Sequence, residues 1–107
     1  MIITLPHIIA RKFSAVTIYP FIFVRHDKCK SDYVLINHEK IHIQQQKELL
    51  WIGFFILYLL EYFAKLLYYR NSFMAYKSIS FEREAYVNEN DLDYLLNRRW
   101  FSSFKFL

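Results

Sequence analysis

Two histidines and a glutamate stand close together in the string His38-Glu39-Lys40-Ile41-His42. On a helix, four steps of about 100° bring His42 to within ~40° of His38, so both imidazoles lie on one face, one turn apart. Two imidazoles in this arrangement can share a zinc ion. Glu39 stands beside them, where it can accept a proton from a water molecule that the metal activates. The string therefore predicts a hydrolytic metal centre.

The helix face that carries the two histidines continues toward the C-terminus. Gln45 and Leu49 fall within ~40° of His38, whereas Gln44 falls on the far side. Gln45 is therefore a candidate contact for a metal ligand or a substrate. We expect Gln44 and Gln46 to lie on the polar surface of the helix.

A catalytic zinc site needs a third protein ligand and an open position for water. The three-histidine pattern H-E-x-x-H-x-x-G-x-x-H is excluded, because Gln45 and Glu48 stand where its glycine and its last histidine would be. His7 and His26 lie upstream, and we expect each to be a surface or strand-end histidine. Cys29, the single cysteine, lies in a polar turn, and we expect it not to be a ligand.

A second acidic segment offers a better third ligand. Glu82, Tyr86 and Glu89 project from one face of a predicted helix, because they are separated by four and three residues. Glu84 is ~200° from Glu82 and is expected to point elsewhere. Ala85 is small and lets this helix approach another one closely. The alternative interpretation is a solvated acidic helix face.

The two motifs together resemble a known family. His38-Glu39-x-x-His42, followed by Glu82-Arg83-Glu84-Ala85-Tyr86, is similar to the gluzincins, zinc metallopeptidases whose third ligand is a glutamate. In several gluzincin branches the second motif reads E-x-x-A-D, and alignment on its alanine makes Glu82 the ligand. The segment from 34 to 90 also resembles small, uncharacterised metallopeptidase-like proteins of Bacteroidetes-type bacteria. This chain has Tyr86 where those gluzincins have an aspartate that orients a zinc-bound histidine.

The resemblance implies zinc-dependent peptide-bond hydrolysis. Zinc would be held by His38, His42 and Glu82, while Glu39 accepts a proton from water and delivers it to the leaving amine. The aspartate that is missing at Tyr86 leaves the partner of the zinc-bound histidines open.

Several side chains are candidates for the supporting roles at this site. The Tyr86 hydroxyl, the Glu89 carboxylate or a backbone carbonyl could orient a zinc-bound histidine, and Gln45 is a further candidate. An oxyanion donor could come from Tyr86, Tyr76 or His26.

The rest of the chain must position these residues. At 107 residues it is long enough for one domain, and a single glycine with two prolines favours long helices. Residues 15–24 are β-branched and aromatic and predict a strand, with Pro20 at an edge or bulge. The first helix is expected to begin near Asn37 or as early as Ser31 or Asp32. A third helix is expected to run from an N-cap at Ser80 to about Leu96.

The sequence thus predicts an α+β, mostly helical fold. We expect 1-107 to form a single minimal zincin-like domain, with a short N-terminal strand or hairpin region followed by three helices. Residues 70–78 are expected to be a connection.

The helix expected between the two motifs is unusually apolar. Residues 49–60 carry no charge, and Glu61 is the first charged residue after them. If Glu61 faces the protein, the stretch from Leu49 to Tyr69 could cross or dip into a bilayer. We rank a helix with one membrane-facing side first, a soluble core helix second and a full span last. Gly53 is expected to mark a bend.

Charge and aromatic content indicate the partners. The net charge is +4, and aromatic residues make up 21% of the chain. Basic residues stand beside aromatic ones in the C-terminal segment 98–107, which fits a membrane surface, with ordinary solvated charge or a packed terminus as the alternatives. No nucleic-acid motif is present, so we expect no nucleic acid partner. We predict a membrane-associated protein, with a cytoplasmic one as the alternative, that acts on a membrane-proximal or hydrophobic peptide or protein substrate and could need a protein partner.

Two rival functions remain open at this point. One is a non-catalytic membrane-associated binding or interaction subunit with a structural or vestigial zinc site. The other is a small membrane-associated protein in which the H-E-x-x-H string is a coincidence.

Overall fold

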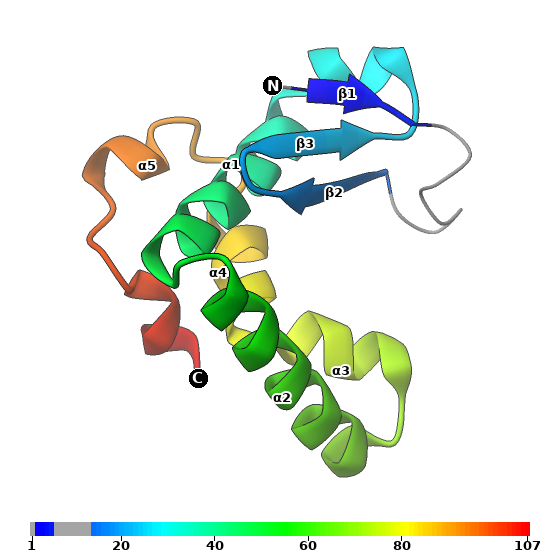
Figure 1. The fold of residues 1–107 in the computed structure, drawn as a ribbon, viewed down its shortest axis with the longest axis vertical. Coiled ribbons are helices and arrows are strands. Elements are labelled where there is room, and N and C mark those ends of the chain that lie inside the picture. Colours follow the sequence, from blue (N-terminus) through cyan, green and yellow to red (C-terminus); the bar gives the residue numbers. More distant parts are fainter. Residues whose placement is uncertain (1, 6–13) are drawn as a thin grey trace.

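The structure is a computed structural model that describes residues 2–5 and 14–107, and it places a small sheet against a group of helices (Figure 1). The strands are β1 (Ile2–Thr4), β2 (Ala15–Ile18) and β3 (Phe21–Val24). Their order is β1-β3-β2, with β1 parallel and β2 antiparallel to β3. Tyr19 and Pro20 form the turn of the β2–β3 hairpin, where proline's fixed φ and missing N–H are tolerated. Residues 15–24 are therefore two strands rather than one.

Helices make up most of the remaining chain, which confirms the predicted α+β, mostly helical class. In the described residues they are η1 (Asp27–Ser31), α1 (Tyr33–Glu48), α2 (Ile52–Tyr69), α3 (Ser72–Ser78), α4 (Ser80–Asn88), α5 (Tyr94–Asn97) and η2 (Ser102–Phe106). The prediction of three helices after the strands identified α1, α2 and α4 and missed the shorter elements.

Helix α1 is the central element of the fold. Asp32 caps it by accepting a hydrogen bond from the Leu35 N–H, so the earlier of the two predicted starts is confirmed. The helix contacts β2 on one side and α4 on another. A small apolar cluster of Ile22, Val24 and Ile36 joins it to the sheet. This placement buries the helix face that carries the two histidines.

A sharp break separates α1 from α2. Leu50 and Trp51 both have positive φ, 55° and 64°, which non-glycine residues adopt only at a cost. The bend predicted at Gly53 is therefore wrong by a few residues, since Gly53 lies inside α2. Beyond the break, Phe54 packs with Ile79 and Phe81 in a second apolar cluster.

The segment after α2 also departs from the expectation. Residues 70–78 are not a plain connection, because Asn71 accepts a hydrogen bond from the Met74 N–H and caps α3. The N-cap of α4 is Ile79, not Ser80, and α4 ends at Asn88 instead of near Leu96. The asparagine and aspartate residues of segment 88–91 favour turns over a continuing helix.

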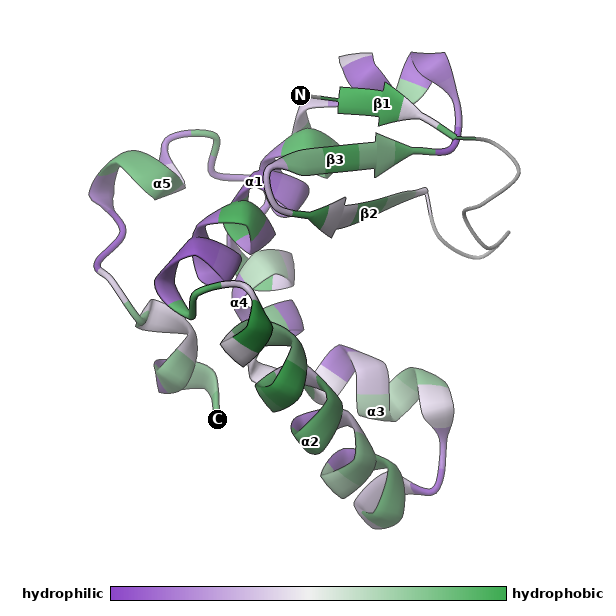
Figure 2. Ribbon diagram, viewed as in Figure 1, coloured by the Kyte–Doolittle hydropathy of each residue, from purple (hydrophilic) through white to green (hydrophobic). Residues whose placement is uncertain are grey.

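Helices α2 and α3 form an antiparallel pair that extends away from the sheet (Figure 1). Helix α2 is coloured as almost continuously hydrophobic, whereas α1 and α4 carry many hydrophilic residues (Figure 2). By length and composition α2 could cross a membrane. Only 6% of its 18-residue window is buried inside the described structure, whereas a core helix would be mostly buried. It is therefore an apolar helix that lies largely on the surface of the described structure.

Candidate metal centre

Three side chains from two helices converge on one point. His38 and His42 come from α1 and Glu82 from α4, and all three are buried. The His38 Nε2 and His42 Nε2 atoms are 3.2 Å apart, and the Glu82 Oε1 atom lies 3.3 Å from the first and 3.2 Å from the second. The ligand atoms of His38, Glu39 and His42 all lie within 4.8 Å of one another. The group of His38, Glu39 and His42 could hold a metal ion.

The outer nitrogen of each imidazole has a defined partner. His38 Nδ1 is 3.2 Å from Glu89 Oε1, and His42 Nδ1 is 2.7 Å from Gln45 Oε1. Both partners are oxygen acceptors, so each Nδ1 carries a hydrogen and donates it. Glu89 and Gln45 thus take the orienting role for which the sequence left several candidates.

Glu39 is held through one of its two carboxylate oxygens. The Thr17 hydroxyl on β2 donates to Glu39 Oε1 at 2.7 Å. Glu39 Oε2 lies 3.9 Å from His38 Nε2 and therefore faces the converging ligand atoms. Strand β2 thus fixes the rotamer of the predicted proton acceptor. Sequence reasoning missed Thr17, because nothing in a strand pattern links it to a helix 22 residues later.

Glu82 is oriented in the same way from the opposite side. The Tyr58 hydroxyl on α2 donates to Glu82 Oε2 at 2.7 Å, which leaves Oε1 facing the histidines. Burial raises the pKa of Glu82, but the charge on His42 and hydrogen bonds from both histidines outweigh it, so the pKa lies far below its ordinary value. Burial lowers the pKa of His42, yet the Glu82 carboxylate raises it to about 9. Glu82 is therefore an anion at neutral pH.

The two tyrosines that the sequence singled out, Tyr86 and Tyr76, lie beside the site and contact each other. The Tyr86 ring packs edge-on against His38, with ring centroids 4.5 Å apart. The hydroxyls of Tyr86 and Tyr76 are 3.0 Å apart, and Lys77 Nζ lies 3.4 Å from the Tyr86 ring centroid. Burial, followed by the charge of Glu82, raises the pKa of Tyr76, so its hydroxyl keeps its proton.

The remaining candidates are not brought to the site. His26 directly precedes η1, and Cys29 packs within the apolar cluster beneath the sheet. Neither belongs to the candidate metal-binding group found among residues 2–5 and 14–107. His7 lies outside the described residues.

Gln46 corrects a prediction, because it is buried rather than on the surface. Its amide donates to the Thr17 carbonyl at 2.9 Å and accepts from the Tyr19 N–H at 2.6 Å. Gln46 therefore pairs with β2 as a neighbouring strand would. It lies only 80° from His38 on the helix, and the strand that covers this flank could not be placed from the helix pattern.

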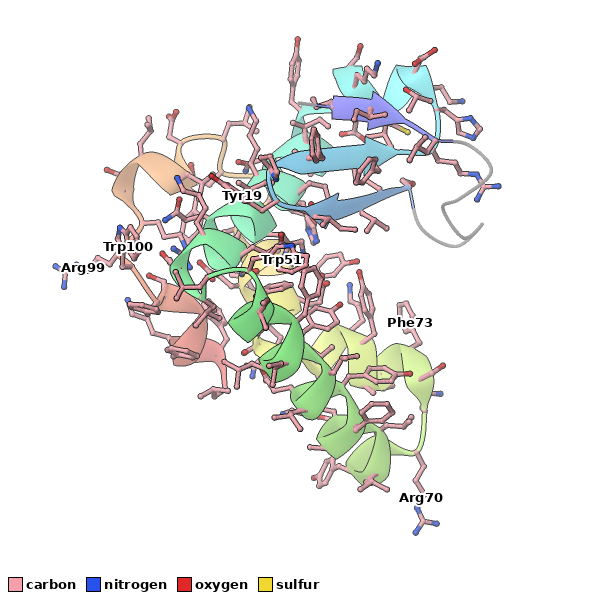
Figure 3. All side chains as sticks on the ribbon, viewed as in Figure 1. Tyr19, Trp51, Arg70, Phe73, Arg99 and Trp100 are labelled. Atoms are coloured by element: carbon pink, nitrogen blue, oxygen red, sulfur yellow. The ribbon has the colours of Figure 1, made fainter. Side chains whose placement is uncertain are left out.

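A cleft of about 600 Å³ opens beside the candidate metal-binding group. Its polar wall carries Thr17, Glu39 and Glu82, and its other wall is apolar and aromatic. That wall is formed by Phe54, Phe55, Tyr58, Leu59, Tyr62, Phe73 and Tyr76 from α2 and α3. Phe73 is visible on the side of α3 in Figure 3. The cleft can therefore take an apolar ligand next to the converging ligand atoms.

No family model, curated protein or solved structure matches this chain. The site must therefore be judged on its own geometry.

Proposed function

We propose that the protein is a zinc-dependent peptidase of the gluzincin type. The observation that carries the proposal is the triangle formed by His38 Nε2, His42 Nε2 and Glu82 Oε1, with sides of 3.2, 3.3 and 3.2 Å. Zinc–ligand distances of about 2.0–2.1 Å in a tetrahedron place neighbouring ligand atoms about 3.3–3.4 Å apart. The triangle thus has the size of one face of a zinc tetrahedron.

The chemistry of the donor set supports the same conclusion. Since both Nδ1 atoms donate to oxygens, the Nε2 atoms are the ones that face the centre, beside an anionic carboxylate, and each offers a lone pair there once a metal displaces its hydrogen. Two imidazoles and one carboxylate form the ligand set of the thermolysin type, which leaves the fourth position open. We therefore infer that His38, His42 and Glu82 bind zinc.

The mechanism follows from the groups around this position. When bound, zinc acts as a Lewis acid that acidifies water and polarises a carbonyl. Glu39, with Oε1 held by Thr17, uses Oε2 to take the proton of the attacking water and transfers it to the amine of the broken peptide bond. Tyr76 lines the cleft as a neutral hydroxyl and can donate to the oxyanion.

The shape of the cleft supports a hydrophobic peptide as the substrate. Its wall from α2 and α3 is built from Phe, Leu and Tyr side chains, so apolar residues on either side of the broken bond would be removed from water there.

Metal analysis tests the ligand assignment. We expect purified wild-type protein to contain one zinc per chain and His38→Ala and Glu82→Ala to contain none. His26→Ala is the matched control, because this histidine lies away from the site, and it should retain zinc. Stoichiometric zinc in His38→Ala would disprove the assigned ligands.

Activity is tested separately, with a quenched fluorescent peptide that has Phe and Leu around the cleavable bond. We expect Glu39→Gln to retain zinc and to lose hydrolysis by at least about 100-fold, because the general base is removed. Zinc without hydrolysis in wild type as well would favour the rival function, a binding subunit with a structural zinc.

We further propose that the exposed side of α2 lies on a lipid bilayer. Six apolar residues, each more than half exposed, fall within an arc of about 100° along about 22 Å of helix. They are Ile52, Ile56, Leu59, Leu60, Phe63 and Leu67, called here the α2 stripe. Trp51 stands at one end of the stripe and Tyr68 with Arg70 at the other, as expected for an interfacial helix (Figure 3).

The charge of Glu61 does not oppose this placement. Its carboxylate accepts hydrogen bonds from the Ser80 N–H and hydroxyl, so it faces α4. Leu59 belongs both to the α2 stripe and to the cleft wall, so a substrate could reach the cleft from the bilayer surface.

Vesicle co-sedimentation tests the proposal. We expect wild-type protein to bind phosphatidylglycerol-containing vesicles and Ile56→Lys/Phe63→Lys not to bind. Val87→Lys, a change of another exposed apolar residue on α4, is the matched control. Equal binding by the double variant would disprove the lipid assignment, and a concentration-dependent dimer that this variant abolishes would assign the stripe to a second copy.

A further inference from the structure

A buried arginine from the C-terminal segment contacts two glutamates behind the metal centre. Arg98 lies just after α5, and 1% of its side chain is exposed. Its guanidinium donates to both oxygens of Glu84 and both oxygens of Glu48. Such a two-sided, fork-like contact requires the planar guanidinium of arginine.

Glu84 in turn determines how the side-chain amide of Gln45 is oriented. The Arg98 guanidinium and the Tyr94 hydroxyl both donate to Glu84, so Glu84 is a carboxylate and only accepts. Gln45 Nε2 donates to Glu84 Oε1 at 2.9 Å and to the Phe81 carbonyl at 3.0 Å. Both hydrogens of the amide are thereby used.

The orientation of Gln45 is transmitted to the metal ligand. With Nε2 directed at Glu84, Gln45 Oε1 faces His42 Nδ1 at 2.7 Å. The reversed amide would place its oxygen against the Glu84 carboxylate and its hydrogens against the Nδ1 hydrogen. Only the observed orientation keeps the hydrogen of His42 Nδ1 in a hydrogen bond, so that Nε2 is the ring nitrogen left for a metal.

We propose that Arg98 and Glu84 are positioning residues for the metal centre, which fix the Gln45 amide and through it the ring nitrogen that His42 offers to a metal. This inference rests on the proposed function for its metal. The C-terminal segment 98–107, which sequence reasoning assigned to the membrane surface, thereby contributes a residue that acts on the site.

His38 provides an internal comparison. Its Nδ1 donates to a carboxylate, Glu89, whose two oxygens are both acceptors. A carboxylate needs no second group to set its orientation. Disruption of the Arg98–Glu84 pair should therefore affect His42 and leave the hydrogen bond of His38 intact.

The test uses Glu84→Gln, which keeps the size of the side chain and removes the requirement that only acceptors face Gln45. We expect it to weaken zinc binding about 10–100-fold in competition with a chromophoric chelator. In ¹⁵N-histidine NMR spectra of zinc-free protein, recorded above the pKa of His42 so that its ring is neutral, the hydrogen-bonded Nδ1 proton of His42 should be lost while that of His38 remains. Arg99→Met, at an exposed neighbouring arginine (Figure 3), should match wild type in both measurements.

A rescue variant separates positioning from general stability. In Gln45→Glu/Glu84→Gln, residue 45 accepts from His42 in either orientation, so part of the zinc affinity and the His42 Nδ1 proton should return. Folded Glu84→Gln with wild-type zinc affinity and spectrum would overturn the proposal, and so would failure of the exchange to restore either.

If Glu84→Gln does not fold, the zinc affinity of Gln45→Met is measured instead, and we expect it to be lower than that of wild type. Retention of wild-type zinc affinity in that variant would overturn the proposal. Absence of zinc binding in wild type would reject the proposed function alone, because the NMR signals report on the proton without metal.

Discussion

The region between α1 and α4 and the α2–α3 pair use opposite means of stabilisation. Between α1 and α4, buried polar groups predominate, and every buried side-chain nitrogen or oxygen in the described residues has a hydrogen-bond partner. The α2–α3 pair is attached to the rest by packed aromatic side chains and by the hydrogen-bonded contacts Tyr58–Glu82 and Glu61–Ser80, and the α2 stripe is left uncovered. The first region therefore depends on orientation and the second on apolar area.

The polar region should be the more sensitive of the two to a single change. Arg98→Met leaves Glu84 and Glu48 buried without a counter-charge, and we expect a loss of about 3–5 kcal/mol in the free energy of unfolding. Urea denaturation followed by circular dichroism measures this loss. A loss below about 1 kcal/mol would contradict the view that the buried carboxylates need the arginine.

The attachment of α2 to the rest of the fold should depend mainly on one apolar residue. Phe54, which is 2% exposed, packs against Phe81 at a centroid distance of 4.7 Å, and Phe54→Ala should cost about 3 kcal/mol. Thermal unfolding measures it, with Phe63→Ala on the α2 stripe as control. Equal losses of stability in the two variants would show that neither side of α2 is packed against the rest of the protein.

A smaller effect is expected where the sheet meets the site. Thr17→Val removes the hydrogen bond that holds Glu39 Oε1, which is worth about 1 kcal/mol. Zinc content should be unchanged, while peptide hydrolysis falls about 3–10-fold. Kinetics with the fluorescent peptide test this prediction, and unchanged turnover would show that Glu39 needs no support from β2.

The smallest effect on stability is expected at the α2 stripe. Ile56→Lys/Phe63→Lys should change the free energy of unfolding by no more than about 0.5 kcal/mol, because both side chains already lie in solvent. Urea denaturation in the absence of lipid gives the value. A large loss would mean that the stripe is covered by protein in solution.

Part of this organisation was predictable from the sequence. Residues linked by the period of one helix were found: His38 with His42 and Gln45, and Glu82 with Glu89. Their joining into one group rested on a resemblance, and the structure brings them together.

The supporting residues that the sequence did not reveal contact the site from other helices and strands. Thr17 and Tyr58 support Glu39 and Glu82 from β2 and α2, and Arg98 reaches Glu84 from beyond α5. Such contacts depend on how elements pack, and no spacing along the chain encodes them. Gln46 was assigned to the surface for the same reason, since the helix pattern does not reveal which flank a strand covers.

The break at Leu50 and Trp51 bears on how the stability of this chain can change during evolution. The Ile52 N–H donates to the Leu50 carbonyl, which closes a tight turn around Trp51. Each of these two non-glycine residues at positive φ lowers the free energy of unfolding by about 1–3 kcal/mol. Glycine in place of Leu50 would relieve most of the strain at that position, because it adopts positive φ without a steric penalty. A glycine at position 50 would therefore raise the free energy of unfolding, and this gain could offset later substitutions that lower stability while changing the chemistry of the site.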